Sequence, residues 1–201
     1  MIFKNLFKSN DLKQKSLSWQ NKDVTVILDN GHGKDTKGKC SPKLEDGSRF
    51  YEYEFNRDIV KRIAEDLDRA GIKYEILVPE EKDISLAERA NRVNKIWKNT
   101  GKKCFLISVH ANAAGMGNEW MNARGWCVFT SKGRTKSDDI ATVFWEEMKT
   151  EFPNNKMRMD TSDGDVDWEA NFAMLYNTKC PAILTENFFY DNKEDCKLLK
   201  S

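Results

Sequence analysis

Strand-like and helix-like segments alternate along this chain, and the alternation limits the folds that it can adopt. Five apolar runs predict strands at residues 24–29, 74–78, 104–109, 125–130 and 181–186. Helical periodicity covers residues 53–70, 85–99 and 137–152. Because strand, helix, strand units form right-handed crossovers, we expect an α/β fold with one mostly parallel, twisted sheet and helices on both faces.

The ends of these helices carry local signals. Gly71 follows the first helix, where a residue with a left-handed backbone commonly ends a helix. Ser85 precedes the second helix and Glu88 stands three residues later, which is the pattern of an N-terminal capping box. We expect Ser137 to begin the third helix.

Length and composition predict a single domain. The 201 residues are enough for one sizeable core, and no composition shift marks an internal boundary. We expect residues 1–22 to form a polar arm or a short helix and residues 23–201 to form the domain. The five cysteines are odd in number and widely spaced, so we interpret them as reduced residues, mostly of the core.

Charge and hydropathy exclude several partners. The 33 Lys and Arg residues nearly balance the 32 Asp and Glu residues, so no global field favours nucleic acid. No stretch approaches the ~20 apolar residues of a membrane span, and the N-terminus has no continuous apolar segment typical of a signal peptide. We therefore expect a protein made in the cytoplasm, without stable membrane insertion.

The polar segment 153–167 overlaps the stretch DTSDGDVDWE, residues 160–169, which invites comparison with a calcium-binding loop. With Gly164 at the sixth position of such a loop, the first ligand would be Met159 and the twelfth Ala170. Neither side chain binds calcium, so we interpret the segment as a solvated surface loop.

Polar side chains follow three of the predicted strands. His32 comes after the first strand, His110 after the strand at 104–109, and Glu186 ends the last strand. In open α/β sheets, functional groups gather beyond the carboxyl ends of the strands, so these three side chains should converge. Glu52 and Glu54 begin the first helix, where a carboxylate also gains from the helix dipole.

Two imidazoles and a carboxylate that leave a fourth position open form the ligand set of a hydrolytic zinc site. Taken singly, a histidine at a strand end is more often a hydrogen-bonded turn residue, and Glu52 alone would be a solvated residue of a first helical turn. Glu186 is different because the apolar residues around it predict burial, and an unpaired buried carboxylate is costly. The set together favours a site.

Five segments follow one another between about Val24 and Cys196: VILDNGHGKDTKGK, EYEFNRDIVKRIAEDLDRAGIKYEI, LAERANRVNK, FLISVHANA and PAILTENFF. In their order and spacing they resemble the zinc-dependent N-acetylmuramoyl-L-alanine amidases of the Amidase_3 type. This resemblance covers nearly the whole chain. It implies that His32, Glu52 and His110 bind Zn²⁺ and that Glu186 is catalytic. Glu52 is favoured over Glu54, which is held in reserve, because the family's ligand stands four residues before an Asn, as Glu52 stands before Asn56.

Two asparagines are candidate substrate contacts. Asn112 lies in the family-like HAN motif and has two interpretations, a hydrogen bond to the turn that holds His110 or a contact to the substrate peptide. Asn187 stands where the family usually has Gly after the catalytic Glu, so it adds a side chain beside Glu186.

The resemblance implies hydrolysis of the amide bond between the lactyl group of N-acetylmuramic acid and L-alanine, with peptidoglycan as the partner. We expect action on the cell wall after release, as in a phage endolysin that needs a holin-like partner or, alternatively, a host autolysin. A monomer is favoured, with the oligomeric state left open. Two alternatives remain: another zinc hydrolase of peptidoglycan, such as a peptidase, and a non-catalytic peptidoglycan-binding module. The presence of all four site residues disfavours the module.

Overall fold

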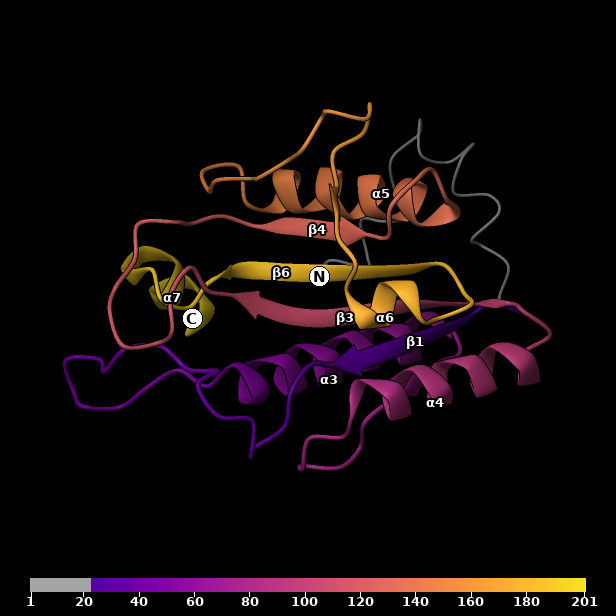
Figure 1. Cartoon of the computed structure of the whole chain (residues 1–201), viewed down its shortest axis with the longest axis horizontal. Coiled ribbons are helices and arrows are strands. Elements are labelled where there is room, and N and C mark those ends of the chain that lie inside the picture. The colour runs from indigo at the N-terminus through magenta and orange to yellow at the C-terminus, as the bar shows by residue number, and fades with distance from the viewer. Residues whose placement is uncertain (1–22) are drawn as a thin grey trace.

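The structure is a computed structural model that describes residues 23–201, so the predicted arm at 1–22 lies outside the described residues. A six-stranded sheet with strand order β2-β1-β3-β6-β4-β5 forms its centre (Figure 1). The strands are β1 (Thr25–Asn30), β2 (Tyr74–Ile76), β3 (Cys104–Asn112), β4 (Cys127–Thr130), β5 (Trp168–Glu169) and β6 (Ala182–Phe189). The helices are α3 (Glu52–Ala70), α4 (Leu86–Asn99), α5 (Lys136–Glu151), α6 (Ala173–Tyr176) and α7 (Lys193–Leu199).

The sheet is mostly parallel, as predicted. Strands β2, β1, β3 and β6 pair in parallel, whereas β4 is antiparallel to β6 and carries β5 parallel to itself at the edge. The carboxyl ends of β1, β3 and β6 therefore meet at one edge of the sheet, the left side of Figure 1.

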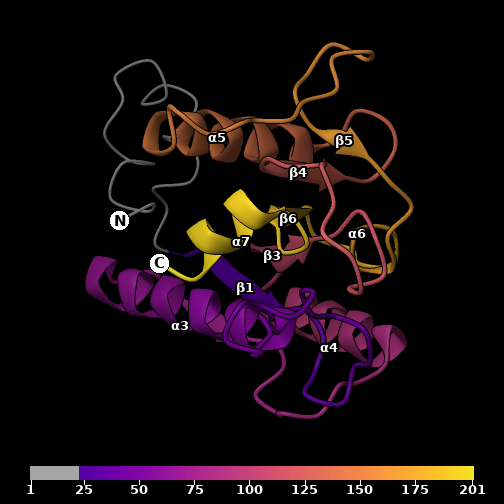
Figure 2. The ribbon, with the colours of Figure 1, turned by 90° about the vertical axis from the view of Figure 1, so that its left-hand side faces the viewer.

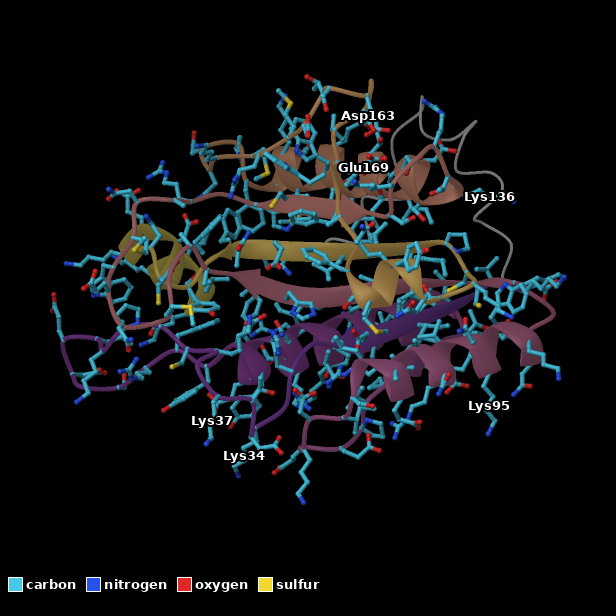
Figure 3. The ribbon with its side chains drawn as sticks, viewed as in Figure 1. Lys34, Lys37, Lys95, Lys136, Asp163 and Glu169 are labelled. Atoms are coloured by element: carbon cyan, nitrogen blue, oxygen red, sulfur yellow. The ribbon has the colours of Figure 1, made fainter. Side chains whose placement is uncertain are left out.

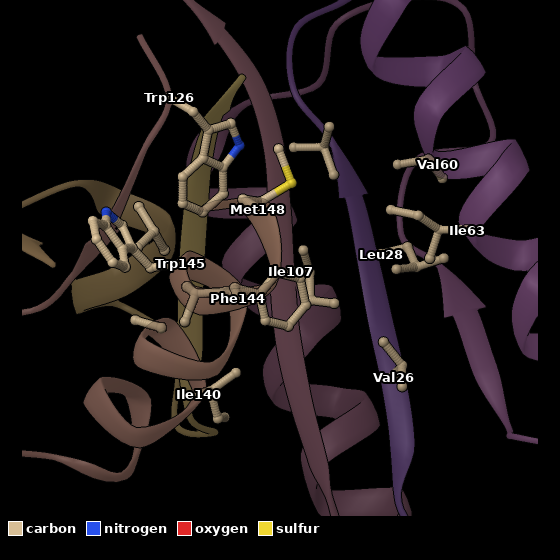
Figure 4. Close-up of a cluster of buried hydrophobic side chains, with 14 of the residues drawn as sticks. Val26, Leu28, Val60, Ile63, Ile107, Trp126, Ile140, Phe144, Trp145 and Met148 are labelled. Atoms are coloured by element: carbon tan, nitrogen blue, oxygen red, sulfur yellow. The ribbon is translucent and has the colours of Figure 1, made fainter. Parts of the chain in front are cut away.

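Helices pack on both faces of the sheet, which Figure 2 shows nearly end-on. Helices α3 and α5 cover one face: Val60 and Ile63 of α3 approach Leu28, while Phe144 and Met148 of α5 lie in the same buried cluster (Figure 4). Helices α4 and α6 cover the other face, through the buried residues Val93, Met174 and Leu175. The apolar side chains of β1 and β3 alternate between these two clusters, so the central strands are buried on both sides.

The predicted helix ends are confirmed in two of three cases. Gly71 ends α3 with a left-handed φ of 68°, and the side chain of Ser85 accepts a hydrogen bond from the backbone N–H of Glu88 at the start of α4. The prediction for α5 was wrong by one residue: the helix begins at Lys136 and Thr135 caps it, in a capping box with Asp138. The Ser137 hydroxyl instead accepts a hydrogen bond from the backbone N–H of Ala182.

All five cysteines are free, and four of them are buried, which confirms the interpretation of reduced core residues. The interpretation of segment 153–167 as a solvated loop holds for residues 161–164, which are exposed, but is wrong at its end, where Asp167 is 1% exposed. Within residues 23–201, no helix has the length and apolar character needed to cross a membrane.

Candidate active site

The turn after β1 holds His32 at the end of the sheet where the carboxyl ends of β1, β3 and β6 meet. His32 has a φ of 64°, which a residue with a side chain rarely adopts. The turn is held on both sides, because the N–H of Gly31 donates to Val109 O at 3.1 Å and Asn56 Nδ2 donates to Gly31 O at 3.0 Å. The carbonyl of His32 itself accepts hydrogen bonds from the guanidinium groups of Arg57 and Arg89. These contacts offset the backbone strain and fix the direction of the imidazole.

A buried ion pair between Arg89 and Asp29 stabilises this turn. Arg89 of α4, 2% exposed, donates to Asp29 Oδ1 at 2.6 Å, and Asp29 also accepts a hydrogen bond from the Ser108 hydroxyl. Asp83 Oδ1 forms a second ion pair with the same guanidinium, at 2.7 Å from Arg89 Nη2. Arg89 was not predicted from the sequence. The available signal was Asp29, a carboxylate inside a predicted buried strand that requires a cationic partner.

Glu52 lies between the two histidines. Its Oε1 is 3.4 Å from His32 Nε2 and 3.0 Å from His110 Nδ1, and it also accepts a hydrogen bond from the backbone N–H of Ala111. The two imidazole rings meet edge to face, with 4.9 Å between their centroids. Glu52 is 1% exposed, whereas Glu54 lies on the exposed side of α3 and accepts a hydrogen bond from the Tyr53 hydroxyl. The structure thus brings Glu52 and not Glu54 to the histidines.

The charges of this cluster depend on one another. Burial raises the pKa of Glu52, but hydrogen bonds from His110 and His32 outweigh it and hold that pKa well below its usual range. Burial alone would lower the pKa of His110, and the hydrogen bond to Glu52 reverses the direction, so that this pKa is raised. Glu52 is therefore an anion with imidazoles on two sides.

Glu186 joins the site from the neighbouring strand. It is the cross-strand partner of His110, in strands that extend beyond the predicted ends: β3 continues to Asn112 and β6 to Phe189. A β-bulge separates this pair from the next, Asn112 with Phe189, and Phe188 takes a left-handed φ of 61° there. Bulges of this kind re-aim side chains beside functional sites. The expectations that His110 follows its strand and that Glu186 closes the last strand were wrong, because pairing continues through the bulge.

Burial raises the pKa of Glu186 to about 7, with the positive charge of His110 opposing the shift and the negative charge of Glu52 adding to it. A carboxyl group in this condition exchanges protons near neutral pH, which suits general acid or base chemistry.

Both predicted substrate contacts use their side chains within the protein. Asn187 Nδ2 donates to the carbonyl of His110 at 2.8 Å, and Asn187 Oδ1 accepts a hydrogen bond from Trp126 Nε1. Asn112 Oδ1 accepts a hydrogen bond from the backbone N–H of Ala113, beside the bulge. These contacts give Asn187 a role in holding neighbouring strands together, whereas the contact of Asn112 is local to the residue that follows it.

A cavity of about 360 Å³ opens beside the histidines. Its lining includes Gly31, His32 and His110 together with the apolar residues Leu86 and Met174. A larger cavity of about 550 Å³ lies at the opposite end of the strands, near Cys104 and Pro181, and none of the predicted site residues lines it.

The side chains of His32, Glu52 and His110 fit a zinc ion. One ligand atom from each lies within 4.8 Å of the others, and two imidazoles with a carboxylate are a donor set that zinc prefers. Glu52 Oε2 is buried and has no hydrogen-bond partner among the described residues. A buried carboxylate oxygen without a partner is costly, and a cation at this position would satisfy it.

Comparison with known proteins finds a matching family model and similar solved structures. The family model described as N-acetylmuramoyl-L-alanine amidase matches residues 26–201. The crystal structure of an N-acetylmuramoyl-L-alanine amidase from Clostridium difficile 630 superposes with a TM-score of 0.70 at 25% identity, over 89% of this chain and 86% of that one.

Two relatives are similar over most of this chain. The endolysin of Bacillus phage SPP1 is 29% identical over 181 residues, and the N-acetylmuramoyl-L-alanine amidase LytC of Bacillus subtilis is 26% identical over 178 residues. These alignments cover 87% and 88% of this chain but 58% and 31% of the relatives, so the chain spans only part of their length.

Proposed function

The chain belongs to the N-acetylmuramoyl-L-alanine amidase family, and on that premise we propose that it hydrolyses the amide bond between the lactyl group of N-acetylmuramic acid and L-alanine in peptidoglycan. The observation that carries the proposal is the cluster of His32, Glu52 and His110 with Glu186 as the cross-strand neighbour of His110. A metal-binding triad beside a titratable carboxyl group is the arrangement that metal-assisted hydrolysis requires.

We propose Zn²⁺ as the cofactor, bound by His32, Glu52 and His110. When bound, zinc supplies a Lewis acid that polarises the substrate carbonyl and lowers the pKa of the attacking water toward about 7. The unsatisfied Oε2 of Glu52 and the nitrogen and oxygen donor set support this assignment.

Glu186 supplies the proton transfers. Its carboxylate accepts a proton from the attacking water and returns that proton to the departing nitrogen of L-alanine, so one side chain serves as base and then as acid. The position of Glu186 is fixed beside the bulge, because the side chain of Asn187 donates a hydrogen bond to the carbonyl of His110 on the neighbouring strand. Asn187 is thus a positioning residue in this proposal.

Gly31→Ala is expected to lower zinc affinity and activity together, because a Cβ atom at Gly31 would collide with the imidazole of His110. A displacement of about 1 Å in a catalytic group can cost ~10²-fold in rate. Zinc content after dialysis and the rate of peptidoglycan hydrolysis measure the effect. Gly38→Ala is a control for destabilisation without a collision, because a Cβ there meets open space although the left-handed φ of 77° strains an alanine. Equal zinc content in the two variants would contradict the assignment of His110.

Digestion of purified peptidoglycan tests the function directly. We expect soluble stem peptides with a free L-alanine amine, identified by mass spectrometry, from the zinc-loaded protein and not after treatment with a zinc chelator. Added zinc should restore the reaction. Cleavage inside the stem peptide would make the protein a peptidase, and binding without cleavage would make it a wall-binding module.

The biological setting that we propose is lysis of the cell wall. The similarity to the SPP1 endolysin supports release at the end of a phage infection, which requires a holin-like partner to open the membrane, and the similarity to LytC supports an autolysin. Both settings use the same bond cleavage and the same site.

A further inference from the structure

A second cluster of carboxylates lies away from the histidines. Asp138 comes from the first turn of α5, and Asp165 and Asp167 come from the end of the loop before β5. One oxygen from each lies within 4.8 Å of the others. Figure 3 labels Asp163 in the same loop and Glu169 of β5, both on the side of the molecule opposite Lys34 and Lys37. The cluster is therefore at the β4–β5 edge of the sheet, remote from the carboxyl ends of β1 and β3.

Asp167 is the buried centre of this cluster. Its side chain is 1% exposed, and its Oδ2 accepts a hydrogen bond from the Thr130 hydroxyl at 2.6 Å. Its Oδ1 is buried without a hydrogen-bond partner, and so is Oδ1 of Asp165. These two oxygens belong to neighbouring carboxylates, and each lacks the donor that a buried oxygen needs.

The charges of the cluster are not balanced by side chains. Within residues 23–201, no lysine or arginine forms an ion pair with Asp138, Asp165 or Asp167. Burial raises the pKa of Asp167 to about 7; the hydrogen bond from Thr130 opposes this shift, and the hydrogen bond with Asp165 and the negative charges of Asp165 and Asp138 add to it. The N-terminus of α5 favours the carboxylate of Asp138, whose Oδ2 accepts the backbone N–H of Thr135. Asp165 and Asp167 receive no comparable donor at their Oδ1 atoms.

We propose that Asp138, Asp165 and Asp167 bind a calcium ion, at a site independent of the proposed zinc centre. Three carboxylates with no nitrogen or sulfur donor select a hard cation. Calcium is favoured over magnesium because it accepts irregular coordination by several carboxylate oxygens, whereas magnesium retains most of its water and uses one or two carboxylates. The ion would satisfy both unpartnered Oδ1 atoms and tie the loop 153–167 to α5 and to the sheet edge.

The spacing of acidic residues along the sequence did not predict this site. A twelve-residue calcium loop would need ligands at Met159 and Ala170, which cannot bind the ion, and the third carboxylate of the cluster comes from α5, 27 residues before Asp165 in the sequence. The ligands are assembled by tertiary structure, through the pairing of β5 with β4.

Terbium luminescence tests the proposal on the zinc-loaded protein. Tb³⁺ replaces Ca²⁺ at oxygen sites, and the indole of Trp168, adjacent to Asp167, would transfer excitation energy to it. We expect Tb³⁺ emission on excitation of tryptophan, and competition by Ca²⁺. Asp165→Asn and Asp167→Asn should weaken Ca²⁺ binding at least ~10-fold, as expected for loss of one charged ligand. Asp163→Asn is the matched control, because Asp163 is an exposed carboxylate of the same loop outside the cluster.

Thermal unfolding supplies the second measurement. Ca²⁺ should raise the Tm of the parent and of Asp163→Asn, but not that of Asp167→Asn, while zinc content stays equal in all three. Trp168→Phe should reduce the emission and retain the calcium-dependent Tm. The proposal is overturned if calcium does not change the Tm of the parent, if magnesium alone does so, or if Asp167→Asn responds like the control. If one of these outcomes is found while the parent and Asp167→Asn both bind zinc and hydrolyse peptidoglycan normally, only the calcium proposal fails and the proposed function stands.

Discussion

Glu186→Gln is expected to lower the rate of peptidoglycan hydrolysis by about 10²- to 10⁴-fold while the protein keeps its zinc. The amide of glutamine has nearly the same shape as the carboxylate, so the hydrogen bonds of Asn187 and the bulge should remain. An amide cannot accept a proton from water or return it to the leaving amine. The ligand set of His32, Glu52 and His110 is unchanged in this variant.

Two measurements on the same preparation separate chemistry from metal binding. Zinc content by elemental analysis should equal that of the parent, and the release of stem peptides under saturating peptidoglycan should fall. Glu169→Gln is a suitable control, since Glu169 is exposed on β5 and lies outside the site. If Glu186→Gln hydrolyses peptidoglycan at the rate of the parent, the proton is transferred by another group.

His110→Ala is expected to lose zinc and activity together. His110 is one of three proposed ligands, and its Nδ1 also contacts Glu52 Oε1. The variant thus removes a ligand and one of the groups that hold Glu52 as an anion. Zinc content after dialysis should fall to background, and hydrolysis should become undetectable at zinc concentrations that saturate the parent. Circular dichroism checks that the fold persists.

A pair of conservative substitutions two residues apart sharpens this test. Glu52→Gln should weaken zinc binding by at least ~10-fold, because the neutral amide is a poor ligand. Glu54→Gln should bind zinc like the parent, because Glu54 lies on the exposed side of α3. The reverse outcome would assign the ligand to Glu54 and would require the start of α3 to rotate.

Much of this fold could be predicted because its signals are local. Burial on both faces makes β1 and β3 continuous apolar runs, and the 3.6-residue period of α3 and α4 follows from their single buried faces. Helix ends were predictable at Gly71 and Ser85, where one residue determines the backbone or the cap. At α5 two hydroxyl residues competed, and Thr135 caps the helix while Ser137 binds Ala182 of β6, a choice that depends on a distant strand.

The site was predictable to the extent that it follows strand order. His32, His110 and Glu186 converge because β1, β3 and β6 are neighbours with parallel directions. What supports the side chains was not predictable, since it depends on partners far apart in the sequence. Arg89 reaches Asp29 across 60 residues, and the bulge at Phe188 exists only relative to β3.

The carbonyl oxygen of His32 links the two helical layers. Arg57 of α3 donates to it at 3.0 Å from one face of the sheet, and Arg89 of α4 donates to it at 3.3 Å from the other. A shift of either helix therefore pulls on the same peptide group, and the imidazole attached to it moves as well. Substitutions on the outer surfaces of α3 and α4, far from any substrate, thus have a mechanical route to the geometry of catalysis.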